Sequence, residues 1–151
     1  MTANQVTEAW GTWVAEMGDW HVFGGITYDP KRRTTQPGSD VVRAHVRSWI
    51  GRDARKSGIC VEAGVVALEY QRNGWPHCHP LLRVRGGARA GLYAELGQLW
   101  FKRHGYAKLE RPKDTAAVSS YAAKYLAKDL DRGDVMFWPV KGPLTIAQLA
   151  L

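Results

Sequence analysis

The sequence predicts an α+β fold, in which a central antiparallel sheet has helices packed on it. Helical and strand-like segments alternate along 151 residues, a length that suits one domain with a single core. Asn73-Gly74 lies between two strand-like segments and is a strong hairpin signal. Because a hairpin is antiparallel, the alternation is not that of a purely parallel sheet. We therefore expect a single sandwich domain over residues 1–151.

The elements of the first half follow from apolar periodicity and from residues that break regular structure. Trp10, Trp13 and Val14 recur at helical spacing, so an amphipathic helix opens the chain. The segment 21–28 (HVFGGITY) is typical of a strand, which an Asp-Pro pair ends. A helix at 39–56 follows, because a Ser-Asp cap precedes an apolar stripe.

The second half contains the hairpin and the segments that return to the sheet. β-Branched residues fill 59–70 (ICVEAGVVALEY), and 77–85 (HCHPLLRVR) is the strand that returns after the turn. Leucines and a tryptophan at helical spacing predict a helix at 90–103. The remaining expected elements are a short strand at 106–109, a helix at 113–129 capped by Lys-Asp-Thr, and a last strand at 135–140.

The chain carries a surplus of positive charge. Lys and Arg number 21 against 14 Asp and Glu, which gives a net charge of +7. Such a surplus favours an anionic partner, most often nucleic acid, although it also serves solubility. No apolar run approaches the roughly 20 residues that span a bilayer, and the N-terminal residues lack a signal-peptide pattern. Two cysteines, Cys60 and Cys78, do not make a disulfide framework. We expect a cytoplasmic protein with no membrane association.

The predicted helix at 113–129 has an unusual polar face. Tyr121, Lys124, Tyr125 and Lys128 fall within about 100° of arc, opposite an alanine-leucine face that suits the core. An exposed helix with solvated lysines would account for this stripe. Tyrosine and lysine together can also perform phosphoryl transfer, because a neighbouring ammonium favours the phenolate and offsets phosphate charge. The four residues are therefore candidate catalytic residues.

The hairpin supplies a candidate metal site. His77 and His79 are two residues apart on a predicted strand, so both imidazoles project from one face. The turn folds Glu69 back beside them, and Glu62 is a weaker alternative because it is farther from the turn. Two histidines and one carboxylate leave coordination positions open, as in a catalytic site for a divalent metal such as Mn²⁺ or Mg²⁺. The alternative is a pair of surface histidines without a metal.

These motifs together resemble those of the HUH endonucleases, in particular the two-tyrosine initiators of rolling-circle plasmids and phages. The HUH motif stands as HCH at 77–79, preceded by GWP at 74–76. The YxxKYxxK motif stands as YAAKYLAK at 121–128, and the first motif stands loosely as FGGIT at 23–27. Order and spacing agree over most of the chain. The double glycine departs from the usual first motif, and no helicase motif is present.

The resemblance implies an RRM-like or ferredoxin-like sandwich with a metal site on the sheet face. It also implies that a tyrosine attacks a phosphodiester of single-stranded origin DNA, which gives a 5′-phosphotyrosyl link and a free 3′-OH. A divalent metal, Mn²⁺ or Mg²⁺, would polarise the scissile phosphate. By the same resemblance Tyr125 is the first candidate nucleophile and Tyr121 the second. Unwinding would fall to a host or separate helicase, and the chain would be a whole nuclease domain or the nuclease part of a longer initiator.

Candidate DNA contacts come from cations and from one tryptophan near the hairpin. By strand parity, two arginines after the HxH motif share its face, where they can contact phosphates. A basic loop after the first strand can clamp a DNA hairpin, and a tryptophan beside the motif can stack on a base. These candidates are Arg83, Arg85, Lys31, Arg32, Arg33 and Trp75.

Three alternatives stand beside this hypothesis. A transposase or relaxase of the same superfamily would use the same nicking chemistry, although relaxases usually add a third histidine that has no counterpart here. A non-catalytic RRM-like domain would bind nucleic acid without cleaving it. A small structural metal-binding domain would leave Tyr121 and Tyr125 unexplained.

Overall fold

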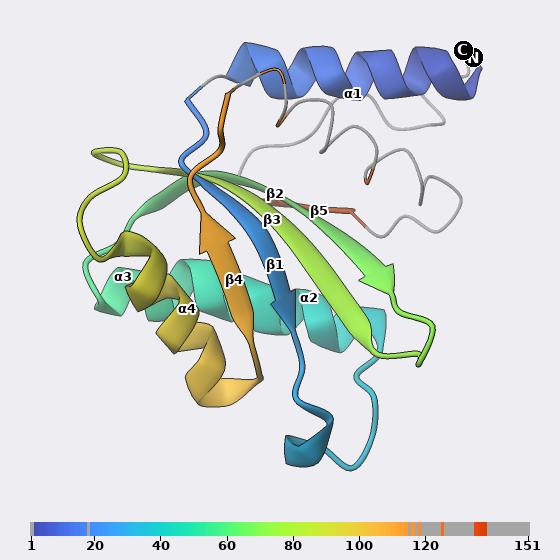
Figure 1. Ribbon diagram of the computed structural model, residues 1–151, viewed down its shortest axis with the longest axis vertical. Helices are drawn as coiled ribbons and strands as arrows, with labels where there is room; N and C mark the ends of the chain where they lie inside the picture. The colour runs from blue at the N-terminus through green and yellow to red at the C-terminus, as the bar shows by residue number, and fades with distance from the viewer. Residues whose placement is uncertain are drawn as a thin grey trace.

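The computed structural model describes residues 2–17, 19–114, 116, 118, 125 and 135–138. They form an α+β fold, as predicted (Figure 1). The elements are α1 (Ala3–Met17), β1 (Val22–Thr27), η1 (Pro30–Arg32), α2 (Ser39–Arg47), η2 (Ser48–Asp53), α3 (Ala54–Lys56), β2 (Val61–Tyr70), β3 (Pro76–Val84), α4 (Leu92–Arg103), β4 (Ala107–Glu110) and β5 (Val135–Trp138). The predicted helix at 113–129 lies almost entirely outside the described residues. Residues 116, 118 and 125, which are described, are helical.

The strands form one antiparallel sheet in the order β4-β1-β3-β2-β5 (Figure 1). β2 and β3 make the predicted hairpin, with Glu69 opposite His77. Its turn is closed by hydrogen bonds from Gln71 N to Trp75 O at 2.9 Å and from Gly74 N to Gln71 O at 2.8 Å. Gly74 has a φ of +83°, a conformation that favours glycine, which explains the Asn-Gly signal.

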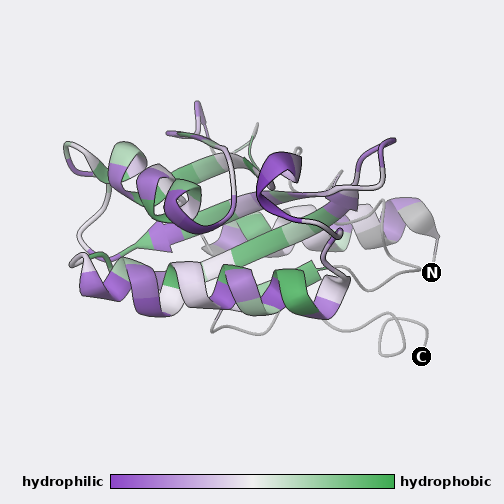
Figure 2. Cartoon of the chain, turned by 90° about the horizontal axis from the view of Figure 1, so that it is seen from below, coloured by the Kyte–Doolittle hydropathy of each residue, from purple (hydrophilic) through white to green (hydrophobic). Residues whose placement is uncertain are grey.

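One face of the sheet is covered by α2, η2, α3 and α4. Trp49 and Trp100 are almost fully buried there, and both indoles find partners: Trp49 donates to Leu96 O and Trp100 to Thr27 O, each at 2.9 Å. Cys78 is buried on this side too, and burial raises the pKa of its thiol to about 12. The strands are coloured mainly hydrophobic and the helices carry both kinds of residue, as expected for elements around a core (Figure 2).

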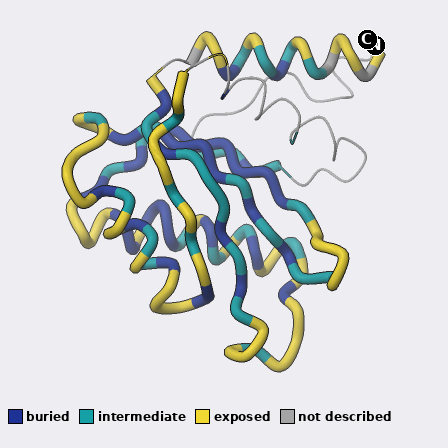
Figure 3. Tube along the Cα trace, viewed as in Figure 1, coloured by how far each residue is buried: buried dark blue, intermediate teal, exposed yellow. Residues whose placement is uncertain are grey.

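The other face carries a second core, where the sequence predicts only one. Trp10 of α1 stacks on Phe137 of β5, with ring centroids 5.4 Å apart and an interplanar angle of 3°. Val14 is fully buried beside them, and Trp20 donates to its carbonyl at 2.8 Å. The second core arises because α1 covers part of the sheet face that α2–α4 leave open. Exposure rises towards the β2–β3 turn and along β4 (Figure 3). The part of the face between the turn and β4 therefore stays accessible.

The predicted helix at 39–56 is helical throughout, but it is not one regular α-helix. Ser48–Asp53 forms a π-helix, a wider turn than the α-helical segments on either side of it. This turn packs against β5, because a Cβ on Gly51 would lie 2.9 Å from the Trp138 ring. Apolar spacing alone does not reveal such a change of pitch.

Among the described residues, no helix has both the length and the apolar character needed to cross a lipid bilayer.

Candidate active site

The two histidines of the HxH motif lie where the sequence predicts, on one face of β3. Cys78 between them is buried on the opposite face. The ring centroids of His77 and His79 are 4.5 Å apart, with an interplanar angle of 67°. Both rings belong to the face that α1 covers only in part, so they form the floor of an accessible site.

Glu69 joins the histidines, and Glu62 does not. The Glu69 carboxylate Oε2 lies 3.1 Å from His79 Nε2, because the hairpin register pairs Glu69 with His77, two residues before His79 on the same face of the sheet. Glu62 instead forms ion pairs with Arg83 at 3.6 Å and Arg85 at 3.2 Å, at the other end of the hairpin. The sequence-based preference for Glu69 over Glu62 therefore agrees with the position of each carboxylate.

The site favours neutral imidazole at His77. Burial lowers the pKa of His77 below its usual value, the nearby His79 lowers it further, and Glu69 opposes both effects. A neutral imidazole keeps a lone pair, which is the form that binds metals. The electrostatics of His77 therefore suit a ligand better than a cationic phosphate contact.

The donor chemistry fits a divalent metal, but the donors now bond to one another. Two imidazoles and a carboxylate are a nitrogen and oxygen set compatible with Mn²⁺ or Mg²⁺. The His79–Glu69 hydrogen bond, however, uses a nitrogen and an oxygen that a metal would need. Within the described ranges, no three His, Cys, Asp or Glu side chains are arranged to hold a metal ion. Metal binding would thus replace that hydrogen bond.

Tyr125, the first candidate nucleophile, lies directly on His79. Its ring stacks on the His79 imidazole, with centroids 3.9 Å apart and an interplanar angle of 24°. It is half-buried and packs against the second core, which holds the ring over the sheet. Tyr121, Lys124 and Lys128, the other predicted catalytic residues, lie outside the described residues.

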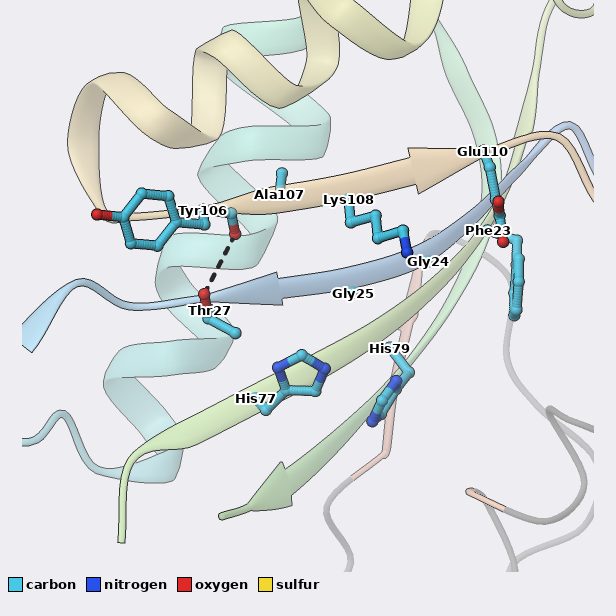
Figure 4. Close-up of a pocket in the computed structure, with 10 residues that line it drawn as sticks. All are labelled: Phe23, Gly24, Gly25, Thr27, His77, His79, Tyr106, Ala107, Lys108 and Glu110. Carbon is cyan, nitrogen blue, oxygen red and sulfur yellow. Dashed lines mark hydrogen bonds between the residues drawn. The ribbon is translucent and has the colours of Figure 1, made fainter. Parts of the chain in front are cut away.

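A groove of about 430 Å³ runs from the histidines across β1 to β4 (Figure 4). Figure 4 shows both imidazoles on the β3 side and the Lys108 side chain on the β4 side, with Gly25 between them. Sequence reasoning missed this groove and the residues contributed by β4. The signal for Lys108 is its register position opposite Gly25, which depends on strand pairing and not on a local motif.

Gly25 of the loosely matching first motif has a steric role. It faces the same side as His77, and a Cβ built on it would lie 2.8 Å from His77 Nε2. That distance is shorter than side chains tolerate, so any larger residue would displace the imidazole. The neighbouring Gly24 has a φ of +153°, and a Cβ there would overlap the Lys108 carbonyl. The double glycine thus makes room for the site and for close pairing with β4.

The predicted DNA contacts are spread over the molecule, and few lie close to the histidines. Arg83 shares their face but lies about 13 Å along β3 from His79, at about 3.3 Å per residue. Arg83 and Arg85 are ion-paired with Glu62. Trp75 packs against the core on the opposite face.

The basic loop lies beyond the end of β1, beside α4. Arg32 donates to the Phe101 carbonyl and its guanidinium sits 4.6 Å from the centre of that ring. Arg33 lies over the Tyr28 ring at 5.6 Å, and Lys31 is exposed. The described structure therefore does not bring these three residues to the histidines.

The chain matches no protein-family model, and a search of curated proteins finds no match.

Proposed function

We propose that the protein is a metal-dependent nicking and joining enzyme for single-stranded DNA, of the HUH type that its motifs resemble. One observation carries the proposal: the Tyr125 ring stacks on His79, beside His77 and Glu69, on an accessible sheet face. Tyr125 lies 46 positions after His79 in the sequence, yet the candidate nucleophile and the candidate metal ligands meet at one place. The net charge of +7 suits a DNA substrate.

The chemistry uses groups already close together. The Tyr125 oxygen attacks the phosphorus of a phosphodiester, the bond from phosphorus to the 3′ oxygen breaks, and the leaving oxygen takes up a proton as a 3′-OH. The phenol proton is released, so the products are a 5′-phosphotyrosyl link and a free 3′ end. His77, His79 and Glu69 would hold the divalent metal, which when bound polarises the phosphate as a Lewis acid. The reverse reaction rejoins the strand, with a 3′-OH displacing the tyrosine.

The wider role that we propose follows from the same resemblance. Cleavage at a specific origin would begin rolling-circle replication of a plasmid or phage, and strand transfer would end it. The domain would be RRM-like and would act in the host cytoplasm, with origin DNA and a separate helicase as partners. A transposase or relaxase would share the chemistry and differ in the DNA that it recognises.

The test is covalent capture of DNA. The protein is incubated with a labelled pool of single-stranded oligonucleotides and Mn²⁺, and adducts are resolved on a denaturing gel. We expect an adduct that Tyr125→Phe removes and that Tyr121→Phe reduces less. Tyr70→Phe, which changes an exposed tyrosine at the end of β2, is the matched control. Absence of any adduct over a range of metals and sequences would refute the enzyme.

A second candidate function is nucleic-acid binding without cleavage. The His79–Glu69 hydrogen bond favours it, because the two groups satisfy one another without a metal. This candidate predicts that DNA binds equally well with Mn²⁺ and with EDTA, and that no adduct forms. Replacement of His77 and His79 by alanine separates the two functions: for the enzyme it abolishes cleavage and leaves DNA binding measurable.

A further inference from the structure

We infer that the groove across β1 holds a second phosphate site, in which Lys108 binds a backbone phosphate of single-stranded nucleic acid. This inference rests on the proposed function and deepens it, by naming a substrate contact outside the sequence motifs. Its basis is the juxtaposition of Lys108 with the histidines across a residue that has no side chain.

Strand register places Lys108 in the same row as His79. Lys108 of β4 pairs directly with Gly25 of β1. On the other side of β1, Phe23 lies opposite Leu81 and Ile26 opposite Cys78, so Gly25 lies opposite His79. Residues paired directly across antiparallel strands point to the same face of the sheet. Lys108 and His79 are therefore two strand spacings apart, about 10 Å between Cα atoms, on one face.

Gly25 leaves the space between them open. The groove of about 430 Å³ lies over this row and is lined by His77 and His79 on one side and by Lys108 on the other. The Lys108 side chain extends over β1 towards Gly24 (Figure 4). A phosphate that enters the groove thus meets an ammonium at the edge opposite the imidazoles.

Lys108 also differs in its charge balance from the arginines that the sequence offers as DNA contacts. Arg83 and Arg85 share an ion pair with the single carboxylate of Glu62, and Arg32 pairs with Asp29. In the part of the chain that the structure describes, the Lys108 ammonium has neither an ion pair nor a hydrogen bond. An unpaired, exposed ammonium is a point charge suited to a phosphate.

Glu110 limits where the phosphate can sit. It lines the same groove, two residues beyond Lys108 and opposite Phe23. The Glu110 carboxylate repels a phosphate at the Phe23 end of the groove. At the opposite end Thr27 pairs with His77, and the nearest acidic residue in that row is Glu69, one strand farther away on β2. The backbone phosphate is therefore held over Gly25 and towards Thr27.

The main test measures binding without chemistry, so it does not depend on nicking. In the full chain carrying Tyr125→Phe, with EDTA present, fluorescence anisotropy follows a labelled 20-nucleotide oligothymidine across a salt series. We expect Lys108→Gln to weaken binding about fivefold at low salt and to reduce the slope of log K against log salt by about 0.7, the value for one phosphate contact on a single strand. Lys108→Arg should restore the slope.

Lys102→Gln is the matched control, because Lys102 is exposed on α4 and does not line the groove. Equal effects of Lys102→Gln and Lys108→Gln would overturn the phosphate site while leaving DNA binding intact. Failure of the parent chain to bind any oligothymidine would refute the proposed function as well. A further arm places one neutral methylphosphonate at successive positions of an oligonucleotide with a defined adduct site. If a methylphosphonate at one position removes the difference in binding between the parent chain and Lys108→Gln, the site is supported. If no position removes that difference, the site is overturned.

Discussion

A stacked pair of histidines, of which His104 is buried and His45 partly exposed, makes the stability of this fold sensitive to acid. His104, at the end of α4, is only 7% exposed, and its ring stacks on His45 of α2 with centroids 4.2 Å apart. The ring of Trp100 lies 4.3 Å away on α4. The Tyr28 hydroxyl hydrogen-bonds to His45 Nδ1 at 2.9 Å. The two imidazoles therefore tie the end of β1 to α2 and to the end of α4.

The surroundings lower the pKa of His104 to about 4. Burial is the main cause, followed by the positive charges of His45, Arg33 and Arg103, and Asp53 opposes them. In the unfolded chain the pKa returns to about 6.5. Between these two values the unfolded state binds a proton that the folded state does not. Stability is thus fully present above about pH 6.5 and is lost as the pH falls towards 4.

The expected loss follows from the two pKa values. Between pH 7.5 and 4.5 the difference corresponds to at most about 2.5 kcal/mol, and partial solvent screening reduces it to about 2 kcal/mol. Urea denaturation at several pH values measures the free energy of unfolding. His104→Phe keeps an aromatic ring against Trp100 and cannot titrate, so we expect it to lose about 2 kcal/mol less than the parent chain over this interval. Parallel curves for the two proteins would refute the reasoning.

Two further predictions concern the candidate site. Gly25→Ala places a Cβ 2.8 Å from His77 Nε2, so the ring must move. We expect nicking to fall at least about tenfold, while the free energy of unfolding, measured by urea denaturation, changes by less than about 1 kcal/mol. Unchanged nicking would contradict the steric role. Glu69→Gln keeps the shape of the side chain and removes the charge that raises the pKa of His77, so an NMR titration of the His77 ring should give a still lower pKa, and an unchanged or higher value would contradict it.

The parts of the site that the sequence predicts are those that depend on short separations. His77, His79 and Glu69 lie within a single hairpin, so strand parity and one turn signal are enough to bring them together. Lys108 is different, because it reaches the groove only through the pairing of β1 with β4, two strands some 80 residues apart. Alternation of helices and strands does not specify which strands become neighbours.

The same distinction holds for the fold. The hairpin, the helix of α4 and the antiparallel sheet follow from local patterns, and the structure confirms them. The division into two cores does not follow from local patterns. The apolar residues of α1 predict that one face of this helix is buried, but they do not indicate which residues it packs against. Trp10 meets Phe137, a residue of the last described strand. Likewise, the glycine at position 25 has no explanation in the sequence alone. The packed His77 ring, which leaves no room for a Cβ there, explains it.

The distribution of the two cores along the chain has a consequence for synthesis. The first core is drawn almost entirely from residues 22–109, whereas the second joins Trp10 to Val118 and Phe137. During translation the first core can close once β4 has left the ribosome, but the second core, against which Tyr125 packs, is complete only after β5 has followed. Before that point a nascent chain would carry its histidines on a sheet face whose second core is incomplete. Under the proposed function, the ability to break a DNA strand would be withheld until β5 has been synthesised.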